Sequence, residues 1–165
     1  MQHVQTRSTT SALVLTAVLI ALATLFTMYT KIPVPGIRGY FNVGDVVIMT
    51  SALLLGRKYG AYIGAIGPAL ADLFLGYAVF VPITFVVKGI EGYLVGTVYN
   101  NKTTTSALVA TIVGGIIIVA GYFIAEYFVF DPGVAIASIL TNTIQAVMSV
   151  IISMILYAIL RRRLG

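Results

Sequence analysis

The chain has 165 residues, 59% of them hydrophobic and only 9% charged, and its mean hydropathy is +1.04. A soluble domain carries about 25% charged residues, because its surface must be hydrated. The composition therefore excludes a soluble globular protein and favours a compact protein that crosses the membrane several times. The net charge of +5 does not indicate nucleic-acid binding, because the basic residues are scattered between apolar runs and form no basic face.

Six apolar runs, separated by polar or Pro- and Gly-containing turns, predict six transmembrane helices. About 20 apolar residues cross the hydrocarbon core of a bilayer, and 165 residues with short connections can hold six crossings. We therefore predict an all-α fold, a single six-helix transmembrane domain that covers residues 1–165. The expected helices are Ser11–Tyr29, Gly44–Leu55, Tyr59–Leu75, Val79–Tyr99, Ala107–Phe130 and Val134–Leu160.

The first connection, Lys31–Asn42, is long for so small a protein and contains Pro33 and Pro35. Proline disfavours helix for the residue before it, so we expect an extended loop here. Its length and its place between the first two helices make it a candidate lid over a ligand pocket.

The basic residues near the helix ends predict the orientation of the chain. Lys and Arg are more frequent in cytoplasmic than in external connections of membrane proteins. With six crossings, seven basic residues lie on the side of both termini, and Lys31 and Arg38 lie on the other side. We therefore expect both termini in the cytoplasm. The seven residues are Arg7, Arg57, Lys58, Lys102, Arg161, Arg162 and Arg163.

Charged residues within the predicted helices are the first candidates for function. Lys88 and Glu91 lie three positions apart on the fourth helix and so share one helical face. A charge in the bilayer core costs on the order of 3 kcal/mol, so such groups usually face a cavity or one another. The pair therefore either neutralises itself within the helix or contacts a ligand. Asp72 on the third helix is expected to be structural and to pair with a neighbouring helix.

Polar side chains in the outer halves of the last two helices extend this pattern. Glu126 ends the fifth helix, and Asn142 and Gln145 lie three positions apart on the sixth, where the amides either bridge helices or bind a ligand. We predict a polar pocket open to the outside, roofed by Tyr40–Gly44 and lined by the fourth, fifth and sixth helices. The expected substrate contacts are Tyr40, Asn42, Lys88, Glu91, Tyr93, Glu126, Asn142 and Gln145. The aromatic candidates for stacking on a flat ring are Tyr40, Phe41, Tyr93, Tyr122 and Phe123.

The sequence contains no constellation for catalysis or for a cofactor. It has no cysteine and a single histidine, His3, which removes thiolate nucleophiles and sites built from cysteine and histidine. It also lacks a glycine-rich loop with the Lys and Ser or Thr that hold a phosphate. We therefore expect no enzymatic activity, no cofactor and no bound metal, and any ATP-driven step must be performed by a partner.

Small residues at helical spacing are a weaker indication of where helices pack closely. Ala17 and Ala21 form an A-x-x-x-A pattern on the first helix, and Gly60 and Gly64 form a G-x-x-x-G pattern on the third. Such faces let helices approach each other closely. We expect internal packing for the third helix, whereas the first helix either packs internally or docks to another protein.

Three segments in order along the chain resemble one family: Gly39–Asp45 (GYFNVGD), Gly67–Tyr77 (GPALADLFLGY) and Thr84–Gly92 (TFVVKGIEG). They resemble the six-helix S components of energy-coupling factor (ECF) vitamin transporters, in the subgroup of riboflavin and hydroxymethylpyrimidine or pyridoxine carriers. The resemblance implies a multi-pass protein of a prokaryotic plasma membrane that captures a water-soluble vitamin outside. It also implies a transmembrane coupling subunit, EcfT, that meets Ala17 and Ala21, and two cytoplasmic ATPase subunits.

The resemblance leaves the vitamin open. The outer half has no basic cluster, which argues against a polyanionic ligand, and a compact neutral heteroaromatic vitamin fits best. A pyridoxine-like or pyrimidine ring and the larger flavin both remain. Two other functions also remain: a self-contained ion-coupled carrier or channel that uses Asp72, Lys88 and Glu91 as a relay, and a membrane-assembly subunit without a ligand.

Overall fold

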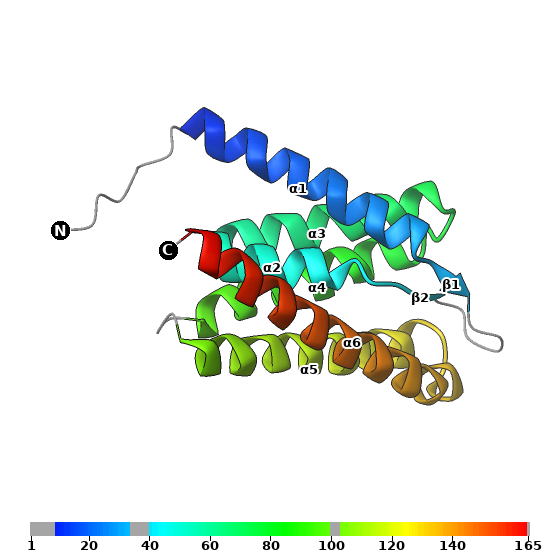
Figure 1. Cartoon of the computed structure of the whole chain (residues 1–165). Helices are drawn as coiled ribbons and strands as arrows, with labels where there is room; N and C mark the ends of the chain where they lie inside the picture. The colour runs from blue at the N-terminus through cyan, green and yellow to red at the C-terminus, as the bar shows by residue number, and fades with distance from the viewer. Residues whose placement is uncertain (1–8, 34–39, 100–102, 165) are drawn as a thin grey trace.

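The computed structural model describes residues 9–33, 40–99 and 103–164, and in these ranges the chain forms six helices and two short strands (Figure 1). The all-α prediction with six helices is thereby confirmed. Arg7, Arg38 and Lys102, which we used to predict the orientation, lie outside the described residues. The elements are α1 (Thr9–Tyr29), β1 (Ile32–Pro33), β2 (Tyr40–Phe41), α2 (Asp45–Leu55), α3 (Arg57–Phe74), α4 (Phe80–Val98), α5 (Thr104–Val129) and α6 (Pro132–Leu164).

The helix ends differ from the predicted ones where the chain continues beyond its apolar run. α5 begins three residues earlier than expected, at Thr104, because the Thr103 side chain caps it by accepting a hydrogen bond from the Ser106 amide at 3.1 Å. α6 continues to Leu164 instead of ending at Leu160. Hydropathy marks the part of a helix that contacts lipid, so it misses polar caps and basic end turns.

Four of the helices in the described ranges, α1, α4, α5 and α6, are long and apolar enough to cross a membrane. α2 has 11 residues and is therefore about 16 Å long, well short of the roughly 30 Å hydrocarbon core. Its residues from Asp45 to Leu53 are all buried, so α2 is enclosed by other helices. α3 carries Arg57, Lys58 and Asp72 among its 18 residues.

Glycine allows α3 and α4 to pack with their backbones in contact. A Cβ added at Gly64 would lie 2.1 Å from the carbonyl oxygen of Lys88, and one added at Gly92 would lie 2.1 Å from that of Gly60. The G-x-x-x-G face of α3 is thus an internal seam, as predicted. α1 packs on the same helix, since a Cβ at Gly67 would lie 2.8 Å from that of Ala23.

The predicted extended loop contributes a small hairpin. β1 and β2 pair antiparallel, with Ile32 opposite Phe41 and Pro33 opposite Tyr40. Figure 1 shows this hairpin and the α5–α6 turn at one end of the bundle, and the beginning of α1 and the end of α6 at the other. The two ends of the described chain therefore lie on one side, as an even number of crossings requires; which side faces the cytoplasm stays a prediction.

Candidate functional site

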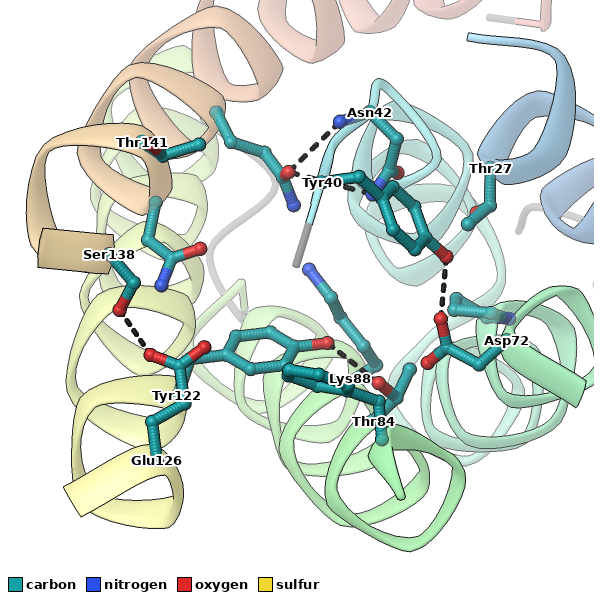
Figure 2. Close-up of a pocket in the computed structure, with 14 residues that line it drawn as sticks. Thr27, Tyr40, Asn42, Asp72, Thr84, Lys88, Tyr122, Glu126, Ser138 and Thr141 are labelled. Atoms are coloured by element: carbon teal, nitrogen blue, oxygen red, sulfur yellow. Dashed lines mark hydrogen bonds between the residues drawn. The ribbon is translucent and has the colours of Figure 1, made fainter. Parts of the chain in front are cut away.

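A polar pocket lies beside the hairpin, between the helices (Figure 2). Its enclosed volume is about 40 Å³, which is room for about one water molecule. Its lining comes from α1, α3, α4, α5, α6 and the segment at β2, and so from more helices than the three expected. The lining residues are Thr27, Tyr40, Asn42, Pro68, Asp72, Phe80, Thr84, Lys88, Tyr122, Glu126, Ser138, Thr141, Asn142 and Gln145.

Lys88 holds the floor of the pocket through two carboxylates. Its Nζ lies 2.5 Å from Asp45 Oδ1 on α2 and 3.6 Å from Glu91 Oε2 on its own helix. All three side chains are buried. A buried charge is tolerated only when it is paired, so Lys88 joins α4 to the enclosed helix α2 instead of only neutralising Glu91. Glu91 is not among the residues that line the pocket, but it contacts Lys88, which does.

Gln145 extends this contact into a network that joins α6 to the hairpin. Its Nε2 donates to Asp45 Oδ2 at 2.7 Å, and its Oε1 accepts a hydrogen bond from the Asn42 amide nitrogen at 3.1 Å. The Asn42 side-chain oxygen in turn accepts from the Gly44 amide at 2.8 Å. Since both ends of the Gln145 amide are engaged, this residue holds the lining in place. This supports the alternative that Gln145 bridges separate parts of the fold by hydrogen bonds.

Tyr40 closes one side of the pocket against α3. Its hydroxyl donates to Asp72 Oδ1 at 2.6 Å, and its ring centroid lies 5.0 Å from that of Tyr77. The Lys31 Nζ lies 5.1 Å from the Tyr77 ring centroid and 5.9 Å from that of Tyr40. Burial raises the pKa of the Tyr40 hydroxyl above its usual range, and the Asp72 carboxylate raises it further, so the hydroxyl remains a donor. Asp72 therefore pairs with the hairpin, where we had expected a helix.

The opposite side of the pocket is formed by α5 and α6. Ser138 donates a hydrogen bond to Glu126 Oε2, and the Tyr122 hydroxyl lies 2.9 Å from Thr84 Oγ1. The Tyr122 ring also lies 5.4 Å from Lys88 Nζ, a cation–π distance. Asn142 lines this side with its Nδ2 atom buried and without a hydrogen-bond partner. Figure 2 shows the Glu126–Ser138 and Tyr40–Asp72 pairs on opposite sides, with Lys88 between them.

Six of the eight predicted contact residues line this pocket, and Glu91 contacts one of them, Lys88. Tyr93 requires a correction: its side chain is 43% exposed, and its ring lies 5.8 Å from the Arg57 guanidinium carbon. Tyr93 follows Lys88 by five residues, a rotation of about 140° around the helix, so it faces away from the pocket. Phe123 lines an apolar groove between α5 and α6 instead. The six lining residues are Tyr40, Asn42, Lys88, Glu126, Asn142 and Gln145.

Sequence reasoning missed Asp45 as a site residue. It lies in the second predicted helix, Gly44–Leu55, but we did not count it among the charged residues within the helices. The available signal was that a carboxylate at the start of a predominantly apolar helix needs a partner. Thr27 and Ser138 were also missed, because hydroxyl side chains are common in transmembrane helices, where they bond to the preceding turn.

Comparisons with a family model and with the sequences of other proteins agree with the resemblance noted in the sequence. The sequence model of the family described as "ECF-type riboflavin transporter, S component" matches residues 7–162. An uncharacterised protein of Pyrococcus woesei is 41% identical over 145 residues, which are 86% of this chain and 96% of that protein. The thiamine precursor transporter HmpT of Lactococcus lactis is 30% identical over 149 residues, which are 89% of this chain and 83% of that protein.

One solved structure, that of the S component of a bacterial ECF transporter, has the same fold. It superposes with a TM-score of 0.75 over 93% of this chain and 96% of that chain. The two sequences are 21% identical, so this similarity concerns the arrangement of the helices.

Proposed function

The chain belongs to the S-component family of ECF-type riboflavin transporters and is thus the substrate-binding subunit of an importer of vitamins or their precursors; we propose that its own substrate is a single-ring heteroaromatic compound of the pyrimidine or pyridoxine type. The observation that carries this proposal is the size of the pocket. An enclosed volume of about 40 Å³ is smaller than a single-ring ligand or a flavin, so the lining must move for either of them to bind. A single ring requires a smaller displacement of the lining than a three-ring flavin with its polyol chain.

The lining supports a flat ligand with polar edges. Three aromatic side chains, Tyr40, Phe80 and Tyr122, face the cavity and offer surfaces on which a ring can stack. Carboxylates, amides and hydroxyls around them offer donors and acceptors in the plane of such a ring. Ligand capture through stacking and hydrogen bonds, without any reaction, is the chemistry of a transport subunit.

The relatives support two ligand sizes. HmpT is named as a thiamine precursor transporter, which favours a pyrimidine, whereas the family description names riboflavin. Riboflavin is therefore the second candidate. The volume of the pocket and the match to HmpT over 89% of the chain together favour the smaller ring.

From the membership in the family we infer a location in a prokaryotic plasma membrane and a complex with a coupling subunit and ATPase subunits. We assign ATP hydrolysis to two cytoplasmic partner subunits, and contact with the transmembrane subunit EcfT to the face of α1 that carries Ala17 and Ala21. Both alanines are exposed, which supports docking over internal packing. The excess of basic residues on the side of the termini supports a cytoplasmic location for both.

The test is a comparison of ligands on the purified chain in detergent. A bound ligand raises the melting temperature in proportion to the logarithm of its concentration over its Kd. We expect hydroxymethylpyrimidine or pyridoxine at 0.1 mM, on the order of 100 Kd for a micromolar binder, to raise it by several degrees and riboflavin to leave it unchanged. Stabilisation by riboflavin alone would assign the larger substrate, and no stabilisation by any of the three would refute the proposal.

A transport assay on the purified chain distinguishes an S component from a self-contained carrier. Proteoliposomes that hold this chain alone should bind the ligand but should not accumulate it when a proton or sodium gradient is applied. Accumulation driven by either gradient would instead support an ion relay through Asp72, Lys88 and Glu91.

A further inference from the structure

Carboxylates gather at the pocket in excess of basic groups. Four of the five acidic residues of the chain line the pocket or contact Lys88, which lines it: Asp45, Asp72, Glu91 and Glu126. Lys88 is the one basic residue among the described lining residues, and its amino group is already engaged by Asp45 and Glu91. The pocket therefore offers a ligand more hydrogen-bond acceptors than its own donors satisfy.

Glu126 is the acceptor that the protein leaves most available. Its side chain is buried, and Ser138 donates to its Oε2 atom. In the described part of the chain no lysine or arginine forms an ion pair with it. A buried carboxylate requires more than one donor to replace the water it has lost, so Glu126 still has capacity for a donor from a ligand.

Asn142 supplies a complementary donor one helical turn away. It follows Ser138 by four residues on α6, and residues at this spacing lie on one face of a helix. Its Nδ2 atom is buried and has no hydrogen-bond partner. Across the pocket on α1, the Thr27 hydroxyl is likewise unpartnered although the residue is only 1% exposed. Buried polar groups are rarely left unpaired, and both of these line a pocket.

We propose that the pocket selects heteroaromatic rings with an amino-substituted edge, in which Glu126 accepts a hydrogen bond from the exocyclic amine and Asn142 donates to the adjacent ring nitrogen. The inference rests on the proposed function and narrows it to the N=C–NH2 pattern of a 4-aminopyrimidine. A ring with an oxo group at the same place presents the reverse pattern, an acceptor beside an N–H donor. That ring would set its oxygen against the Glu126 carboxylate, which disfavours binding.

The test compares two probes that differ only at this edge: 4-amino-5-hydroxymethyl-2-methylpyrimidine and its 4-oxo counterpart. Binding of each is measured by isothermal titration calorimetry on the full chain in detergent. We expect the amino compound to bind at least about tenfold more tightly, the effect of one hydrogen bond to a charged group. The variant Glu126→Gln keeps the shape of the side chain but can also donate, so it should remove most of this preference.

A second variant keeps the test decisive if Glu126→Gln does not fold. Asn142→Leu replaces an unpaired buried amide with an apolar group of similar size, which should not destabilise the fold. The variant should nevertheless bind the amino compound about tenfold more weakly. Asp131→Asn is the matched control, because Asp131 is exposed in the α5–α6 turn and its side chain accepts from the Val134 amide, away from the pocket lining. It should leave both affinities unchanged.

The outcomes separate this inference from the proposed function. The inference would be overturned if the unaltered chain bound the two probes with equal affinity. It would also be overturned if Glu126→Gln lowered the affinity for both probes by the same factor. In either case the protein would remain a pyrimidine-binding subunit. Tight binding of pyridoxine with no binding of the amino compound would also overturn the inference alone. If no single-ring compound binds, the proposed function fails as well.

Discussion

The Lys88 amino group on α4 contacts the Asp45 carboxylate on α2 at 2.5 Å, although the two residues are 43 positions apart in the chain. Asp45 also accepts from Gln145 on α6, so one buried carboxylate joins three helices under the pocket. The floor of the site is therefore a structural element of the fold. Changes to it should affect stability and ligand binding together.

The variant Lys88→Met tests this coupling. It leaves Asp45 and Glu91 buried without a cation, and the loss of one partner from a buried ion pair costs about 3–5 kcal/mol. We expect a large fall in melting temperature in detergent and at least about tenfold weaker ligand binding. The double variant Lys88→Met/Asp45→Asn should recover part of the stability, because it removes the unpaired charge. A single variant as stable as the unaltered chain would show that the pair does not hold the floor.

The contact between Tyr40 and Asp72 should control how fast a ligand leaves. Tyr40→Phe removes the hydroxyl that donates to Asp72 at 2.6 Å and so weakens closure of the hairpin over the pocket. We expect the dissociation rate to rise by about tenfold, measured by competition with excess unlabelled ligand. Tyr29→Phe is the control, since Tyr29 is exposed at the end of α1. An unchanged rate in Tyr40→Phe would mean that the hairpin closes without this hydrogen bond.

The same contact should be insensitive to pH over the neutral range. Burial, and then Asp72, raise the pKa of Tyr40 above its usual value. Because folding raises this pKa, the stabilisation is fully present below about pH 10, the usual pKa of tyrosine, and is lost only as the pH rises further. The ratio of dissociation rates between Tyr40→Phe and the unaltered chain should thus be constant from neutral pH to about pH 9. A ratio that changes within this window would identify another titrating group as the control.

The close packing of α3 on α4 should not tolerate a methyl group at Gly64. A Cβ there would lie 2.1 Å from the Lys88 carbonyl oxygen, whereas a Cβ at Gly89 would lie 3.2 Å from that of Ala65. Gly64→Ala should therefore destabilise the protein by about 1–3 kcal/mol and weaken ligand binding, because it displaces Lys88. Gly89→Ala should cost less. Thermal unfolding of both variants side by side checks this order, and the reverse order would contradict the packing.

Ala17 and Ala21 are expected to form the docking face for the coupling subunit. Both are exposed on α1, and only small side chains allow helices to approach closely. Ala17→Trp or Ala21→Trp should abolish co-purification with EcfT but leave ligand binding by the isolated chain unchanged. Leu108→Trp, on the exposed face of α5, is the control and should affect neither. Loss of ligand binding in the alanine variants would place these residues in internal packing instead.

The sequence by itself determined the helical architecture, and it predicted several of the residues that line the pocket. Hydropathy is a local property, so six helices follow from the order of apolar runs without any tertiary information. Four of them are long and apolar enough to cross a membrane, and the sequence did not single out α2 as too short. The same reasoning identified Lys88, Glu126 and Asn142. A charge or amide within an apolar run must avoid lipid, and in a bundle this small the interior offers few places for it.

Only the tertiary structure decided which groups meet. Tyr93 was expected in the pocket but faces away from it, because the rotation of α4 about its own axis is set by the glycine contacts with α3. Asp45 was passed over, yet it is the partner of Lys88. Spacing along one helix indicates which residues share a face, but it does not indicate which other helix that face contacts. Contacts between distant segments depend on the packing of all six helices together, and no local pattern in the sequence records them.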